Sequence, residues 1–178
     1  MRRLLLLAAV ALAACQPPAD KNAPPPATTS TPTSVVAACN DVAPDATKQV
    51  QLQTQPLAAA ALAEGLDGGP VSPGVYDLTA GNVADGAPMW ASPRAVALAV
   101  TESGGAVTFN YAAAPAAGDT ERWTASFADG PPATLTFSCG RTGATPVTFE
   151  AQGANLRLVI PDASGVGSVY YTFARRSA

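Results

Sequence analysis

Apolar and polar residues alternate along most of the chain beyond residue 70. The alternation is cleanest between residues 133 and 139, where Leu135, Phe137 and Cys139 share one face and hydroxyl residues occupy the other. A period of two is typical of strands with one buried and one solvated face. The pattern predicts about eight strands, at residues 74–79, 96–100, 106–112, 123–127, 133–139, 146–150, 156–160 and 169–173.

Short, turn-rich connections separate these segments, among them Ser103-Gly104-Gly105 and Asp129-Gly130-Pro131-Pro132. Such turns favour an antiparallel meander, which closes into a small barrel or stays open as a sandwich. One short helix is expected before the strands, from Pro56 to Glu64, because proline is favoured in the first turn and Gly65 ends the segment. The fold class is therefore all-β with one N-terminal helix.

A long segment with many Gly and Pro residues, Gly81 to Pro93, interrupts the strand pattern and carries adjacent Met89 and Trp90. Loops are usually polar, so these side chains either pack on the end of the barrel or bind a partner. Tyr76, near the start of the first strand, is a further candidate. We take Tyr76, Met89 and Trp90 as the candidate binding residues.

The first residues have the anatomy of a signal peptide. Arg2 and Arg3 precede an apolar run, and small residues precede Cys15. Leu12-Ala13-Ala14-Cys15 resembles the lipobox of bacterial lipoproteins, which implies cleavage after residue 14 and a lipid on Cys15. Such proteins with Asp after the cysteine are often held at the inner membrane, so Gln16 favours the outer membrane, with the domain facing the periplasm.

Residues 15–38 form the lipidated cysteine and a linker rich in Pro, Thr and Ala, and residues 39–178 form a single β domain. Proline keeps such a linker extended at about 3.1 Å per residue. Loss of Arg2 and Arg3 leaves eight of the ten basic residues against thirteen acidic ones, a net charge of −5. An acidic domain argues against nucleic acid and favours a basic or neutral partner.

Cys39 and Cys139 remain once Cys15 carries the lipid. In an oxidising envelope compartment an even pair favours a disulfide. It would close a loop of about a hundred residues, worth roughly 4.7 kcal/mol in the chain-entropy model. The alternative, a metal or redox site, has no His and no Cys-x-x-Cys spacing to support it.

The chain carries no motif of a catalytic site. Without His there is no Ser-His-Asp triad and no histidine-bound metal, and P-loop and Gly-x-Ser-x-Gly patterns are missing. Asp119 and Glu121 would share a face if both lay on a strand, but beside Gly118 and Arg122 they indicate a solvated strand end. Asp162 alone offers too few oxygens for Ca²⁺. We expect no enzyme, no metal and no cofactor.

Two short segments resemble known families. Pro73-Gly74-Val75-Tyr76 resembles in part the Gly-x-Trp opening of lipocalins, with Tyr in place of Trp. Residues 164–171 resemble elements of the lipid-anchored lysozyme inhibitors, which are small acidic barrels that bind a basic enzyme. The first resemblance implies a carrier of a small apolar ligand, and the second a protein-binding surface.

The sequence thus predicts a non-enzymatic outer-membrane lipoprotein. Its β domain would bind a protein of the cell envelope, for instance a basic partner that it inhibits or scaffolds. The alternative is a lipocalin-like carrier or sensor with a hollow barrel and Trp90 near its opening. We favour protein interaction, because a filled small barrel requires no further feature.

Overall fold

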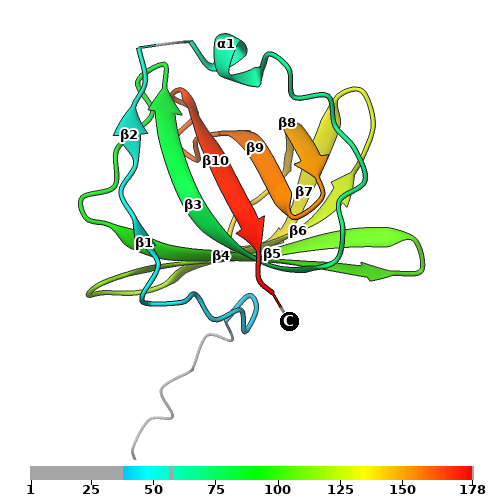
Figure 1. Cartoon of the computed structure of the whole chain (residues 1–178), viewed down its shortest axis with the longest axis horizontal. Helices are drawn as coiled ribbons and strands as arrows, with labels where there is room; N and C mark the ends of the chain where they lie inside the picture. The colour runs from blue at the N-terminus through cyan, green and yellow to red at the C-terminus, as the bar shows by residue number, and fades with distance from the viewer. Residues whose placement is uncertain (1–37, 57, 178) are drawn as a thin grey trace, which may run out of the picture. The chain divides into compact units, whose positions relative to one another are not determined.

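The computed structural model describes residues 38–56 and 58–177. Eight antiparallel strands, β3 to β10, each pair with the next, and β10 pairs with β3. They thereby close into a barrel, which excludes the sandwich (Figure 1). The strands are β3 (Gly74–Ala84), β4 (Arg94–Ser103), β5 (Ala106–Pro115), β6 (Glu121–Ala128), β7 (Ala133–Cys139), β8 (Ala144–Gln152), β9 (Asn155–Pro161) and β10 (Ser168–Arg175). Two short strands, β1 (Gln49–Val50) and β2 (Gln53–Thr54), precede them.

Side chains fill the interior of the barrel. Most of the apolar residues that alternate in the sequence point inward and are at most 9% exposed, while Val107 is only partly buried. Aromatic rings stack through the core: Phe109 lies on Phe127 with ring centroids 4.9 Å apart, and Tyr111 lies on Trp123 at 4.7 Å. The expected alternation is therefore confirmed as the pattern that builds a packed core.

The helix and the first long strand differ from their expected limits. Helix α1 spans only Ala59–Ala63, because Ala58 is extended and the first free amide, on Ala59, donates to the Asp85 carboxylate at 2.8 Å. It flanks the barrel at β9 and β10 (Figure 1). Strand β3 continues to Ala84, since Val83 and Ala84 are buried and pair with β10, so the loop with Met89 and Trp90 starts only at Asp85.

Cys139 does not share the inward face of Leu135 and Phe137, contrary to the expectation. A bulge in the β6–β7 pairing places Cys139 opposite Thr124, whose side chain lies on the outer face, while Phe137 remains opposite Ala125. Bulges redirect side chains in this way. The sulfur is thereby turned outward to meet Cys39, and the expected disulfide is present, with Cα atoms 5.5 Å apart.

Residues 38–56, here called the strap, complete the barrel wall. Strand β3 pairs with β4 only from Gly74 to Asp77. Farther along, β3 still pairs with β10 but no longer with β4, which leaves a slot between β3 and β4. Strand β1 fills the β4 side of this slot and β2 fills the β3 side (Figure 1). Between them Leu52 enters the core and is 1% exposed.

Within residues 38–56 and 58–177, no helix has the length and apolarity needed to cross a membrane. The expected signal peptide, the lipid on Cys15 and all but the last residue of the linker lie outside the described residues. From residue 39 on, the described residues belong to the β domain.

Candidate functional site

Successive connections lie at opposite ends of the barrel, because its strands alternate in direction. We call one end the mouth and the other the base. The mouth carries the loops 85–93, 116–120, 140–143 and 162–167, and the base carries the turns 104–105, 129–132 and 153–154. Segment 65–73, which connects α1 to β3, also runs to the base (Figure 1).

The structure separates the three candidate binding residues. Met89 and Trp90 lie in a mouth loop, whereas Tyr76 lies in the part of β3 nearest the base. Tyr76 is 2% exposed, and its hydroxyl donates to the carbonyl of Ser72 at 2.7 Å. Tyr76 therefore acts as a core residue whose polar end is satisfied, and only Met89 and Trp90 can form part of one surface.

Trp90 covers part of the barrel interior at the mouth. Its ring stacks against Tyr171, with centroids 6.3 Å apart, and the Arg94 guanidinium lies 5.1 Å from its centroid. Its backbone carbonyl accepts a hydrogen bond from Gln51 of the strap at 3.0 Å. Met89 is exposed and accepts a weak contact from the Thr54 hydroxyl. The strap and the loop thus hold each other at the mouth.

A charged bridge continues this cover. Glu121 accepts from Arg94 at 3.0 Å and from Arg141 at 3.3 Å. Arg141 lies over the Trp123 ring, 5.9 Å from its centroid, and its Nε is buried with no hydrogen-bond partner. Asp119 lies in the loop before β6 and is exposed, while Glu121 begins β6, which agrees with the solvated strand end expected from the sequence.

Two tyrosines lie beneath the bridge. Burial raises the pKa of Tyr111 well above its ordinary value and raises the pKa of Tyr171 to about 12. The two side chains are also hydrogen-bonded to each other. Both phenols are neutral at physiological pH, so this end of the barrel lacks a tyrosinate that could act as a base.

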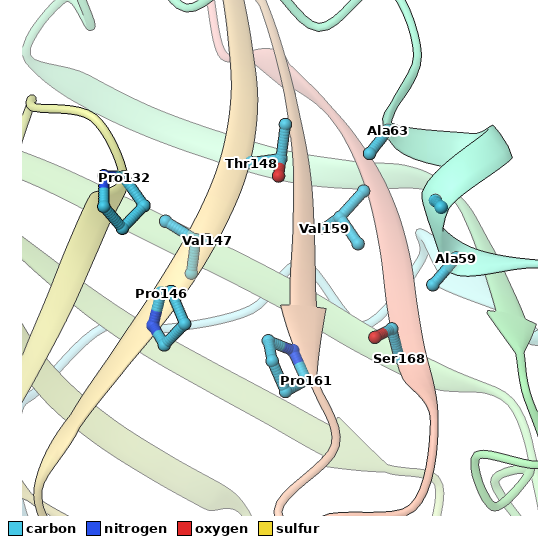
Figure 2. Close-up of a pocket in the computed structure, with 10 residues that line it drawn as sticks. Ala59, Ala63, Pro132, Pro146, Val147, Thr148, Val159, Pro161 and Ser168 are labelled. Carbon is cyan, nitrogen blue, oxygen red and sulfur yellow. The ribbon is translucent and has the colours of Figure 1, made fainter.

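An apolar groove lies on the outside of the barrel, between α1 and the strands β8, β9 and β10 (Figure 2). Its volume is about 270 Å³, and its walls are made by Ala, Pro, Val, Thr and Ser, among them Ala63, Pro132 and Val159. No charged side chain lines it. It offers apolar contact without a group that would orient a ligand.

Asp77 holds the N-terminal strap and the C-terminal residues of the domain against the outer wall of the barrel. It faces outward from β3 yet is only 3% exposed. Lys48 of the strap donates to it at 2.8 Å, and Arg176 near the C-terminus donates to both carboxylate oxygens. Burial alone would raise the pKa of Asp77, but the hydrogen bonds from Arg176 and Lys48 outweigh it and lower the pKa below 3.8.

Comparisons with known proteins identify no relative. No protein-family model matches the chain, and no curated protein or solved structure shows significant similarity. Among the described residues, no three His, Cys, Asp or Glu side chains lie close enough to hold a metal ion. Any function must therefore be argued from the surfaces themselves.

Asp77→Asn is expected to destabilise the domain by about 1–3 kcal/mol near neutral pH, because two cations lose their buried acceptor. The folded-state pKa is lowered, so this stabilisation is present above the unfolded value of 3.8 and is lost as the pH falls through the folded value. Urea unfolding of both proteins across this range measures it. Glu150→Gln, which removes a more exposed pair with Arg157, is the matched control and should cost less.

Several functional residues escaped the sequence analysis. Val50 and Leu52 alternate with Gln49, Gln51 and Gln53, a period-two pattern that indicates a strand, and this segment is absent from the eight predicted strands. Arg94 and Arg141 gave no comparable sign. Their meeting at Glu121 brings together the mouth ends of β4 and β6 and the loop after β7, which are far apart in the sequence.

Proposed function

We propose that this protein is an outer-membrane lipoprotein, anchored through Cys15 and facing the periplasm, whose β domain binds another protein through its surface and catalyses no reaction. The packed interior is the observation that carries the proposal. Inward side chains such as Phe109, Leu135 and Phe173 are at most 1% exposed, and core rings stack, as Phe109 does on Phe127. A carrier needs an internal space that these residues occupy.

The surfaces of the domain support the same proposal. The groove beside α1 lies on the outer wall, and two further hollows lie at the base of the barrel. At the mouth, Trp90 and the bridge of Arg94, Glu121 and Arg141 lie over the tyrosines. The net charge of −5 that remains without Arg2 and Arg3 favours a basic partner.

Photo-cross-linking in living cells, paired with native mass spectrometry, tests this function. A photo-reactive amino acid is placed in the full chain at exposed positions of the base, the outer wall and the mouth: Pro131, Thr136 and Met89. We expect a protein adduct of one mass from the position on the binding surface and none from positions on the other surfaces. The native spectrum of the full chain in detergent should show no bound small molecule.

The opposite result would support the lipocalin-like carrier. In that case a small molecule would remain bound to the purified chain and would be lost on Trp90→Ala, because Trp90 covers the interior. No position would then give a protein adduct. This outcome would overturn the proposed function.

A further inference from the structure

Two hollows adjoin each other at the base of the barrel. The first, of about 380 Å³, lies between segment 66–68, the turn 129–133 and strand β8. The second, of about 560 Å³, lies between Pro70 and Val71 on one side and residues 102–107 and 127–129 on the other. Asp129 lines both, so a single occupant can span the pair. We call these two depressions the base hollows.

Apolar side chains provide much of their lining. Leu66, Pro131 and Pro132 contribute to the first hollow, and Pro70, Val71 and Phe127 contribute to the second. Val71 also packs against the core, so this part of the lining is held by the barrel. A rigid apolar lining costs little conformational entropy when it receives a partner.

The charges around the base hollows have one sign. Asp67 lines the first, Glu102 lines the second, and Asp129 lines both. All three side chains are exposed, and none forms an ion pair with another described residue. No Lys or Arg lines either hollow. Of the basic residues at this end of the barrel, Arg157 pairs with Glu150 and Arg176 with Asp77, while Arg175 lies beside Gly74 and donates to the carbonyl of Pro73.

The spacing of the three carboxylates favours a protein partner over a bound metal ion. They are not grouped closely enough to hold one cation, since the described residues contain no three acidic side chains in metal-binding proximity. Three separated carboxylates around apolar depressions instead suit several cationic side chains carried along one chain.

We propose that the base hollows dock a segment of a partner protein in which Lys or Arg side chains alternate with small apolar residues. The apolar residues would enter the hollows, and the cations would pair with Asp67, Glu102 and Asp129. This inference rests on the proposed protein-binding function and names its surface and the chemistry of its partner.

The first described residues of the strap lie far from the base hollows. The strap is fixed at Cys139, at one end of β7, while Ala133, at the other end of β7, lines the first hollow. These positions are about 20 Å apart along an extended strand. The described start of the chain, at residue 38 next to Cys39, therefore lies at the other end of β7 from the base hollows.

A fluorescein-labelled synthetic peptide that repeats Lys-Pro-Leu is the probe, and the same peptide with Glu in place of Lys is its control. The full chain in neutral detergent should bind the Lys peptide saturably and the Glu peptide not at all. Asp67→Asn with Asp129→Asn should weaken binding roughly fivefold, the sum of two exposed ion pairs. Asp41→Asn with Asp119→Asn removes the same net charge elsewhere and should leave binding unchanged.

A photo-reactive version of the Lys peptide locates its site. Cross-links to residues 66–71, 102–107 or 128–133 are expected. Cross-links elsewhere, equal weakening by the two double variants, or no saturable binding would overturn the inference. The proposed function would survive those results if cross-linking in cells gave a protein adduct from Thr136 or Met89 but not from Pro131, and would fall with the inference if it gave none.

Discussion

Replacing Cys39 and Cys139 together by serine is expected to destabilise the folded domain by about 4 kcal/mol, the largest effect among the variants considered. The disulfide closes a sequence separation of 100 residues. In the chain-entropy model a loop of this length restricts the unfolded chain strongly. The strap also depends on it: Asn40, next to Cys39, donates to the carbonyls of Tyr111 and Trp123.

Thermal unfolding of the oxidised protein and the double variant measures this cost. A loss of this size lowers the melting temperature by about 10 °C in a domain of this length. The reduced wild-type chain should behave like the double variant, which separates the effect of the bond from that of the serine side chains. An unchanged melting temperature would mean that the polar contacts of the strap alone hold the wall closed.

The barrel strands were predictable because their inward residues obey a simple rule. Each long strand has one buried face, so the period of two is visible without knowledge of its neighbours. Short turns then allow only a meander, and pairing β10 with β3 closes it. The disulfide followed from counting the cysteines and from the compartment that the lipobox implies.

The rest depended on contacts between distant parts of the chain. Asp77 looks like an ordinary solvated residue of an alternating strand, and it is buried only because the strap and Arg176 lie on it. Outward alanines such as Ala95 and Ala97 are likewise at most 1% exposed, and β1 of the strap pairs with β4 at Ala95. The outward turn of Cys139 depends on a bulge between β6 and β7 that no local pattern marks.

Leu52→Ala is expected to cost about 2–4 kcal/mol, the second largest effect. Leu52 is 1% exposed and is the side chain by which the strap enters the core. Its truncation leaves a cavity between β3 and β4 that β1 and β2, with two residues each, are too short to close. Urea unfolding measures the loss, and a change below 1 kcal/mol would mean that the strap lies on the wall without completing it.

Gly81→Ala is expected to cost about 1–3 kcal/mol by overpacking. A Cβ at position 81 would lie 2.5 Å from a terminal methyl of Leu52, closer than side chains approach each other. Gly81 lies on β3 opposite Tyr171, so its missing side chain leaves the space that Leu52 occupies. Glycine is required here for that close approach, since its backbone conformation is one that other residues adopt.

The double variant Leu52→Ala with Gly81→Ala should cost less than the sum of the two single variants by about 1 kcal/mol or more. Its new methyl group no longer meets the leucine and occupies part of the cavity that the leucine left. Leu135→Ala combined with Gly81→Ala is the matched control. Leu135 is fully buried but is not among the atoms near position 81, so its effect should be additive. Additivity in both pairs would contradict the insertion of Leu52 beside Gly81. Coupling confined to Leu52 would establish the strap as a part of the wall that encloses the packed interior.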